Sequence, residues 1–461
     1  MYLERCGSFV KILIAGYGQV GETLAKELSA EGHDLTLMDA DSEVLKVGMD
    51  RYDVMAVQGN CASMKALDRA GVKNADLLIA CTGSDELNLL CCVTAHAVNP
   101  HLHTIARIRN PEYTEQAYHM RDAFALSMAF NPEHQAAEEI GRLLKFPGFR
   151  KRDSFAKGRV QIVEIRIDAD SKLCNVPLSG LYGIVKCRVL VCTVLRGEKA
   201  IMPAGNFMLQ EGDRIFVTAP TDTLATLLKN LGIVTHKVRR VMIAGGGTMA
   251  YYLAEALCES RMDVTVIEKD EERCVELASA FPKASIIHGD VKDRSLLESE
   301  NISSADALVT LTGFDELNML ISLYGHRKEV PQIITRLDNA EISGITGDMP
   351  IGSMICEGQL CCNQIVRYVR AMQNQTGAAV TIHSIADGQA EAMEFLVDES
   401  TLHCGEPLKK LKLKENILLV CISRGTQTEI PNGDSVFHPG DSVIVVAGGD
   451  RVVLQLNDIF A

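Results

Sequence analysis

Two glycine-rich turns in the sequence have the residue types and spacing that bind phosphate groups. The first turn reads GYGQVG at residues 16–21 and follows an apolar run. Gly16 permits a tight turn, Gly18 removes a side chain that would block a pyrophosphate, and Gly21 lets the next helix pack on the strand. The free N–H groups at the start of that helix attract phosphate oxygens. This pattern predicts a dinucleotide site, although a glycine turn that binds nothing is the alternative.

An acidic residue follows each turn at the spacing expected of a ribose ligand. Asp39 ends the second apolar run, 21 residues after Gly18. Its carboxylate can accept hydrogen bonds from ribose hydroxyls and repels a 2′-phosphate, which favours NAD over NADP. The second turn, GGGTMA at residues 245–250, is followed in the same way by Glu268. This copy is also expected to bind a ligand, although a duplicated site can become purely structural.

Further polar residues follow the later apolar runs, where ligands bind at the carboxyl edge of a parallel sheet. QGN and HGD, after the third run, can recognise an adenosine. The Thr-Gly pair of TGSDELN and TGFDELN, after the fourth run, lets the backbone approach the nucleotide, and an arginine ends the fifth run. That arginine can reach a phosphate or serve as a surface or salt-bridge residue. We expect Asp85 and Asp315 to cap the next helix. The predicted binding residues are Gly16, Gly18, Gln19, Val20, Gly21, Asp39, Asn60, Thr82, Gly83 and Arg107 in the first copy, and Gly245, Gly247, Thr248, Met249, Glu268, Asp290, Thr312 and Arg336 in the second.

The chain is a tandem duplication. Gly16, Gly18 and Asp39 recur 229 positions later as Gly245, Gly247 and Glu268. The agreement continues beyond the nucleotide motifs, because LRGEKAIMPAGN is matched 228 positions later by SRGTQTEIPNGD. Offsets this constant over such a length indicate two copies of one two-part unit.

Each unit is predicted to contain two kinds of domain. Its first part alternates strand-like and helix-like stretches, as in an α/β domain with a doubly wound parallel sheet. Its second part has β-branched runs divided by Gly, Pro and Asp, which indicates a small α+β domain. In the first copy the strands are expected at 11–16, 34–39, 54–59, 76–82 and 103–108, and a connecting helix at 133–149 that Pro147-Gly148 ends. The predicted domains are 9–150 and 239–375, which bind nucleotide and include the connecting helices, and the small domains 155–232 and 380–461.

Composition excludes several classes of function. A net charge of −14 argues against nucleic acid or anionic lipid as the main partner. The 15 cysteines are scattered without a C-x-x-C pair, so we expect reduced thiols. His96, His101 and His103 lie close in sequence, but no ligand set completes a metal site. Without a signal peptide or a membrane-spanning run, the protein is expected to be soluble and cytoplasmic.

No catalytic constellation accompanies the two nucleotide motifs. A dehydrogenase needs an acid or base held against its substrate, and the residues that the small domains share lie in turns. We therefore expect a sensor and no enzyme. An NAD-dependent soluble oxidoreductase and a sensor subunit of another cation transporter, such as a cation/proton antiporter, are the alternatives.

The order of the motifs resembles the RCK (KTN) regulators of potassium conductance. A GxGxxG turn and an acidic residue precede QGN, TGSDELN and ARIRNPEY, and a helix and a small LRGEKAIMP domain follow. The resemblance covers essentially the whole chain, and two tandem units are similar to the cytoplasmic subunits of Trk-type potassium uptake systems. It implies an RCK N-terminal Rossmann-like domain and an RCK C-terminal domain in each half. It also implies a homo-oligomeric ring, expected to be a tetramer, held at the inner face of the plasma membrane by a pore subunit similar to TrkH.

The resemblance also implies that NAD(H) or ATP/ADP shifts the shape of the ring and thereby opens or closes the pore. Family members tuned to ATP often carry an arginine inside the glycine turn, where Gln19 and Thr248 are neutral. NAD(H) is therefore expected at the first site, and NAD(H) or ATP/ADP at the second.

Overall fold

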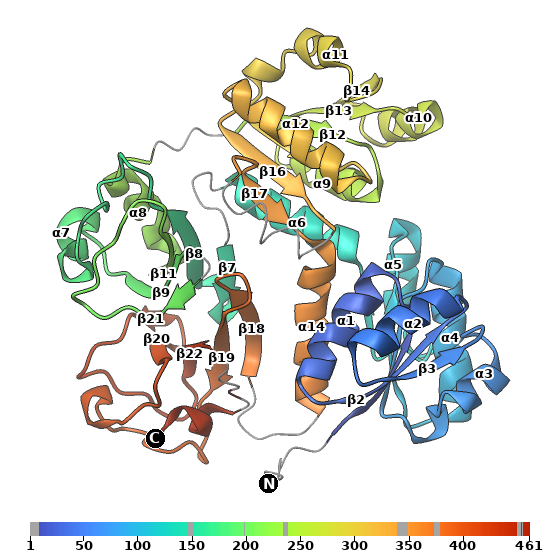
Figure 1. The fold of residues 1–461 in the computed structure, drawn as a ribbon, viewed down its shortest axis with the longest axis horizontal. Coiled ribbons are helices and arrows are strands. Elements are labelled where there is room, and N and C mark those ends of the chain that lie inside the picture. The colour runs from blue at the N-terminus through green and yellow to red at the C-terminus, as the bar shows by residue number, and fades with distance from the viewer. Residues whose placement is uncertain are drawn as a thin grey trace.

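The computed structural model describes residues 9–145, 152–197, 199–233, 238–338, 349–372, 379–449, 453 and 455–461 (Figure 1). Within these residues each half of the chain forms one Rossmann-like domain with a parallel sheet and one small domain with an antiparallel sheet. The predicted α/β fold and its duplication are thus confirmed.

The first Rossmann-like domain has a six-stranded parallel sheet in the order β3-β2-β1-β4-β5-β6. The order reverses beside β1, which is where ligands of such sheets bind. The five predicted strands are present, and a sixth, β6, is added at the edge. The elements are β1 (Lys11–Ala15), α1 (Gln19–Ala30), β2 (Asp34–Asp39), α2 (Ser42–Arg51), β3 (Met55–Gln58), α3 (Met64–Arg69), β4 (Leu77–Ala80), α4 (Asp85–Val98), β5 (His103–Arg107), α5 (Pro111–His119) and β6 (Met128–Phe130).

The second Rossmann-like domain repeats this arrangement in the order β14-β13-β12-β15-β16-β17. Met249, Leu253 and Leu257 are buried on one face of its first helix, as Val20, Leu24 and Leu28 are on α1. The elements are β12 (Arg240–Ala244), α9 (Thr248–Glu259), β13 (Asp263–Glu268), α10 (Glu271–Ala280), β14 (Ser285–His288), α11 (Arg294–Ser299), β15 (Ala307–Thr310), α12 (Asp315–Arg327), β16 (Gln332–Arg336) and β17 (Ser353–Ile355).

The helix that leaves each Rossmann-like domain packs against the other one (Figure 1). Helix α6 (Pro132–Lys145) buries Ile140 and Leu143 in one core with α9 and β12 of the second half. Helix α14 (Glu357–Met372) buries Ile365 and Val369 against α1 and β1 of the first half. The two halves therefore exchange helices. The predicted end of the first helix, at Pro147-Gly148, lies outside the described residues.

The two small domains also share a core. The buried side chains of Phe155, Val160 and Phe216 pack with Val420 and Ile444 of the other sheet. The sheet orders are β10-β9-β11-β8-β7 and β18-β19-β22-β20-β21. The elements are β7 (Arg152–Phe155), β8 (Val160–Arg166), α7 (Leu181–Val185), β9 (Leu190–Arg196), β10 (Lys199–Ile201), β11 (Arg214–Pro220) and α8 (Leu224–Leu231) in the first, and β18 (Ala379–Ile385), β19 (Ala390–Leu396), β20 (Ile417–Arg424), β21 (Gln427–Glu429) and β22 (Ser442–Gly448) in the second.

An arginine ties the small domains together at the edge of this core. The Arg214 guanidinium pairs with Glu164 of its own sheet at 2.6 Å and with Asp387 of the other small domain at 2.6 Å. The two halves are therefore joined at two places, by exchanged helices and by facing sheets.

Candidate functional site

The first glycine turn is shaped by close backbone contacts. Gly16 has φ +100°, and a Cβ there would lie 2.8 Å from the carbonyl carbon of Cys81. A Cβ on Gly21 would lie 2.1 Å from the Gly16 oxygen, so the start of α1 can pack this closely only without a side chain. At Gly18 a Cβ would meet nothing within 4 Å. The turn is thus tight toward the protein and open toward solvent at Gly18, which is the geometry that admits a phosphate.

The N-terminus of α1 is left free for a ligand. Gly18 is its N-cap residue, and no side chain caps the first N–H groups. Unpaired N–H groups and the helix dipole favour an anion at this point. Gln19 lines the open side, whereas the Val20 side chain is buried in the core and only its backbone is available.

Asp39 holds the turn from the end of β2. Its Oδ2 accepts a hydrogen bond from the Tyr17 N–H at 2.7 Å, and its Oδ1 accepts one from the Asp41 N–H at 3.0 Å. Each carboxylate oxygen has a further lone pair for a ribose hydroxyl. Asn60, after β3, lines the same cavity, and its Oδ1 accepts a hydrogen bond from Ala62 N–H at 2.9 Å.

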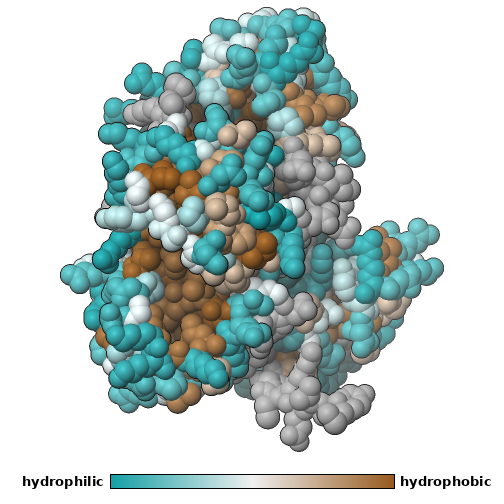
Figure 2. Space-filling model, turned by 60° about the vertical axis from the view of Figure 1, so that its left-hand side comes forward, coloured by the Kyte–Doolittle hydropathy of each residue, from teal (hydrophilic) through white to brown (hydrophobic). Residues whose placement is uncertain are grey.

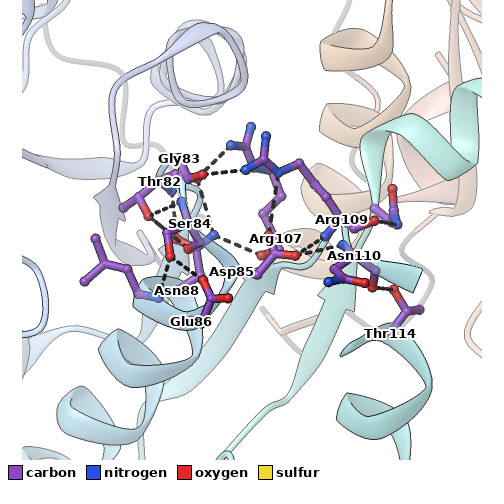
Figure 3. Close-up of polar contacts among 12 residues, drawn as sticks. Thr82, Gly83, Ser84, Asp85, Glu86, Asn88, Arg107, Arg109, Asn110 and Thr114 are labelled. Atoms are coloured by element: carbon purple, nitrogen blue, oxygen red, sulfur yellow. Dashed lines mark hydrogen bonds and ion pairs between the residues drawn. The ribbon is translucent and has the colours of Figure 1, made fainter. Parts of the chain in front are cut away.

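The loop after β4 is held by a buried asparagine (Figure 3). The Asn88 Oδ1 accepts hydrogen bonds from the Thr82 N–H at 2.8 Å and the Thr82 hydroxyl at 2.7 Å, and its amide donates to the Arg107 carbonyl at 2.9 Å. The Arg107 Nη2 donates to the Thr82 carbonyl at 2.7 Å, and Arg109 donates to the Gly83 carbonyl. Figure 3 shows the two arginine side chains, one from the end of β5 and one from the segment after it, reaching toward this loop. These hydrogen bonds thus tie the ends of β4 and β5 together on one side of the site.

These elements surround a cavity of about 780 Å³. That volume lies in the range of small-molecule and cofactor sites. Both halves of the chain line it, because Arg336 and Glu357 of the second half stand beside the residues of the first. The lining residues are Gly16, Gly18, Gln19, Val20, Met38, Asp39, Ala40, Gly59, Asn60, Cys61, Cys81, Thr82, Gly83, Leu87, Arg107, Arg109, Glu133, Arg336 and Glu357.

The second copy repeats this arrangement at its turn, at Glu268 and at Thr312, and the Arg336 carbonyl accepts from the Asn318 amide at 3.0 Å as the Arg107 carbonyl does from Asn88. Gly245 has φ +105°, a Cβ on Gly247 would meet nothing within 4 Å, and the Glu268 Oε2 accepts from Gly246 N–H at 2.6 Å. Asn318 holds Thr312 as Asn88 holds Thr82, with Oδ1 2.9 Å from the Thr312 nitrogen. The Arg336 side chain, however, lines the cavity of the first copy.

One contact separates the second turn from the first, whereas Thr248, Met249 and Asp290 repeat the arrangement of Gln19, Val20 and Asn60. The Arg273 Nε donates to the Gly246 carbonyl at 2.8 Å, whereas the corresponding residue of the first copy is Val44. The turn begins α9 at Thr248, and the Met249 side chain is buried in the core. Asp290 accepts a hydrogen bond from the Lys292 N–H at 2.9 Å. The second turn thus carries a guanidinium beside its backbone that the first one lacks.

A cluster of charged residues lies where the two halves meet at the first cavity. Arg336 pairs with Asp338 at 2.9 Å and with Glu357 at 3.2 Å. Burial raises the pKa of Glu357 to about 7; Arg336 opposes this shift, and the carboxylates of Glu133 and Asp338 add to it. Burial likewise raises the pKa of Glu133. The cavity therefore has titratable carboxyl groups among its arginines.

The predicted helix-capping role of Asp85 and Asp315 is wrong. The hydroxyl of Ser84 caps α4 by accepting from the Leu87 N–H at 3.2 Å. The Asp85 Oδ2 instead accepts from the N–H groups of Arg109 and Asn110, each at 2.8 Å. Asp315 likewise accepts from the Asp338 N–H at 2.9 Å. In each copy the carboxylate of the first helical residue accepts from backbone N–H groups of the loop that follows the fifth strand.

Several residues of the site were not predicted from the sequence, both those that hold the loop after β4 and those that the connecting helices bring to the cavity. The signal for Asn88 and Asn318 was present, because both TGSDELN and TGFDELN end in asparagine. Arg109 lies in the ARIRNPEY motif, two residues after the predicted Arg107. Glu133 and Glu357 carry no local signal, since their proximity depends on the exchange of helices.

Two classes of feature are missing from the described residues. None of their helices combines the length and apolarity needed to cross a bilayer. No three or more His, Cys, Asp or Glu side chains among them are grouped to hold a metal ion.

Family models and relatives match the chain along its length. The TrkA-N domain model matches residues 12–127 and 241–356, and the TrkA-C domain model matches residues 162–232 and 392–460. The "Trk system potassium uptake protein TrkA homolog 1" of Methanosarcina mazei is 30% identical over 443 residues, which cover 95% of this chain and 97% of that protein. The "Trk system potassium uptake protein TrkA" of Haemophilus influenzae is 30% identical over 463 residues, with 98% of each chain covered.

Solved structures share the fold at low sequence identity. The "GsuK Channel" structure superposes with a TM-score of 0.61 at 16% identity, covering 97% of this chain and 78% of that one. The "Crystal Structure of the GsuK RCK domain" gives a TM-score of 0.60 at 15% identity, covering 97% and 94%. Because both domain models match in each half and the relatives match end to end, the chain belongs to the TrkA family of Trk system potassium uptake proteins.

Proposed function

We propose that the protein is a nucleotide-binding regulatory subunit that gates a membrane potassium uptake transporter of the Trk type. The observation that carries this proposal is the first cavity, which combines an open glycine turn, Asp39 and arginines from both halves. A ligand that touches both halves has different affinities for different arrangements of them, and therefore shifts the population of those arrangements. The names of the relatives support potassium uptake as the process that is regulated.

NAD(H) is the ligand we propose for the first site. Asp39 and the neutral Gln19 favour two ribose hydroxyls over an additional phosphate. A structure titled "GsuK channel bound to NAD", with a TM-score of 0.59 at 16% identity, supports nucleotide binding by this fold. For the second site we propose NAD(H) or ATP/ADP, since Arg273 adds positive charge beside that turn.

We further propose that four copies form a ring in the cytoplasm beneath a TrkH-like membrane subunit. Leu90 on α4 and Leu320 on α12 occupy equivalent positions and are 52% and 64% exposed. Figure 2 shows apolar residues gathered in hollows on the side of the molecule where the small domains lie. Exposed apolar patches of this kind mark contacts with other protein surfaces.

A matched pair of variants tests the proposal. Gly18→Glu and Gly247→Glu each place a negative side chain in open space at one turn, because a Cβ there meets nothing within 4 Å. Each change should abolish nucleotide binding at its own turn by repelling the phosphates, without unfolding the domain. Potassium uptake should lose its response to NAD(H) in cells that carry Gly18→Glu in place of the wild-type chain.

Two results would contradict the proposed function. Potassium uptake could be unaffected both by deletion of the protein and by Gly18→Glu, or the purified chain could bind neither NAD(H) nor ATP/ADP in isothermal titration calorimetry. Steady oxidation of NADH with a metabolite would instead support the oxidoreductase alternative.

A further inference from the structure

Arg336 reaches from the second half of the chain into the cavity of the first half. It ends β16, and its side chain is only 18% exposed. Its Nε donates to the Asp338 Oδ1 at 2.9 Å, and its Nη2 contacts the Glu357 Oε1 at 3.2 Å. An arginine buried at the boundary between two domains, with a cavity in front of it, is well placed to recognise an anion.

The polar groups around Arg336 are not all satisfied. Among the described residues, the Oε2 atoms of Glu133 and Glu357 and the Nε of Arg107 are buried and have no hydrogen-bond partner. All three residues line the first cavity. Buried polar atoms without partners are rare in folded proteins. The Arg107 Nε is a donor that a phosphate oxygen can satisfy, whereas the two carboxylate oxygens are acceptors that a phosphate cannot satisfy.

We propose that Arg336 binds a phosphate of the nucleotide in the first cavity together with Arg107, and that Glu357 competes with this phosphate for Arg336. The proposal rests on the proposed function, since it concerns the same site. A phosphate offers the planar guanidinium two acceptors, as a carboxylate does. The two anions cannot both hold the same donors, and unpaired carboxylates beside an incoming phosphate repel it.

This competition would link the ligand to the arrangement of the two halves. Glu357 begins α14, which packs on α1 directly behind the first glycine turn. When Arg336 leaves Glu357 for a phosphate, a contact within the second half is replaced by one that passes through the ligand to the first half. The nucleotide therefore favours the arrangement in which Arg336 lines the first cavity.

Protonation of Glu357 should favour the nucleotide. The charged groups that act on Glu357 are Arg336 and Asp338 at the end of β16, Glu133 on α6 and Arg107 on β5. Because the pKa of Glu357 is raised to about 7, the carboxyl group loses its charge as the pH falls from 8 to 6. The ion pair between Glu357 and Arg336 then weakens. The pyrophosphate of NAD does not change its charge in this range, so NAD reports on the protein alone.

The test uses the full chain with Gly247→Glu, so that only the first turn can bind. NAD affinity is measured by isothermal titration calorimetry at pH 6 and pH 8. Arg336→Gln should weaken binding about tenfold or more, because a charge-assisted contact is lost. Glu357→Gln should tighten binding several-fold at pH 8 and reduce the difference between the two pH values, leaving only the part that Glu133 contributes.

Glu31→Gln is the matched control. Glu31 forms a buried ion pair with Arg370 at the other end of α14, away from the cavity. This change removes a comparable charge from the same interface and should leave NAD affinity unchanged. Circular dichroism of each variant checks that the fold is retained.

The results separate this inference from the proposed function. If the parent chain binds no nucleotide, the proposed function fails. If the parent binds NAD but Arg336→Gln has the same affinity, or Glu357→Gln binds more weakly, the competition between Glu357 and phosphate is refuted while the proposed function stands. Misfolding cannot mimic the expected pattern, because a damaged site does not bind more tightly.

Discussion

The charged side chains of the first cavity oppose one another at close range. Arg336 has two carboxylate partners, and Glu133 adds a third negative group nearby. Burial lowers the pKa of Arg336, but Glu357 and Asp338 raise it overall, so the guanidinium stays charged. The cost of burial therefore falls on the carboxyl groups of Glu133 and Glu357, whose pKa values are raised.

Glu357→Gln should stabilise the folded chain at neutral and higher pH. The folded-state pKa of Glu357, about 7, lies above the ordinary value of 4.5, so the folded chain binds the proton more tightly than the unfolded chain. The contribution of this group to stability is therefore greatest below the unfolded pKa and is lost as the pH rises to about 7. The penalty removed at pH 8 is at most about 3 kcal/mol. Urea midpoints of variant and wild type should coincide near pH 4.5 and diverge by pH 8; a constant difference across this range would refute the assignment.

At the scale of elements, the two Rossmann-like domains exchange the helices α6 and α14. Each helix is amphipathic and must bury an apolar face, and each finds its partner in the opposite Rossmann-like domain. Gln135 on α6 and Gln364 on α14 are hydrogen-bonded where the two helices meet. The two helices thus lie together between the two Rossmann-like domains, at the centre of Figure 1.

Truncating one buried isoleucine on each helix should destabilise the opposite half. Ile365 and Ile140 are both fully buried, so alanine at either position should cost about 2–5 kcal/mol. Hydrogen exchange should accelerate in β1 and α1 for Ile365→Ala, and in β12 and α9 for Ile140→Ala. Faster exchange in the Rossmann-like domain that precedes the mutated helix, with the other one unchanged, would contradict the exchange of helices.

At the scale of the whole molecule, the two halves form one unit with a pseudo-symmetric plan. The exchanged helices join the Rossmann-like domains, and the facing sheets join the small domains. Glu394 adds a buried contact between the small domains, because its Oε2 accepts from Ala156 N–H at 2.9 Å. Neither half buries its apolar surfaces alone.

The halves should therefore stay together when the chain between them is cut. A protease site inserted between residues 233 and 238 breaks the single covalent link. After cleavage, size-exclusion chromatography should give the elution volume of the intact chain, and urea should be needed to separate the fragments. Fragments that separate in native buffer would show that the shared cores are too weak to hold the molecule.

The sequence by itself determined the features that depend on near neighbours. The alternation of strand-like and helix-like stretches predicted the parallel strands, and β6 was not predicted because three residues carry too little pattern. The glycine turns were readable because a positive φ at Gly16 and the close approach at Gly21 are demands on single residues. The duplication was readable because equivalent residues recur at a constant offset.

Only the tertiary structure decided which of two equivalent partners each element meets. An amphipathic helix shows that it must bury a face, but α1 and α9 present nearly the same surface to α6 and α14. The choice depends on the geometry of the whole chain, since the free energy of burial is non-directional. Arg336 and Glu357 belong to elements of the second half that border the first cavity. A residue predicted for the second site therefore lines the cavity of the first.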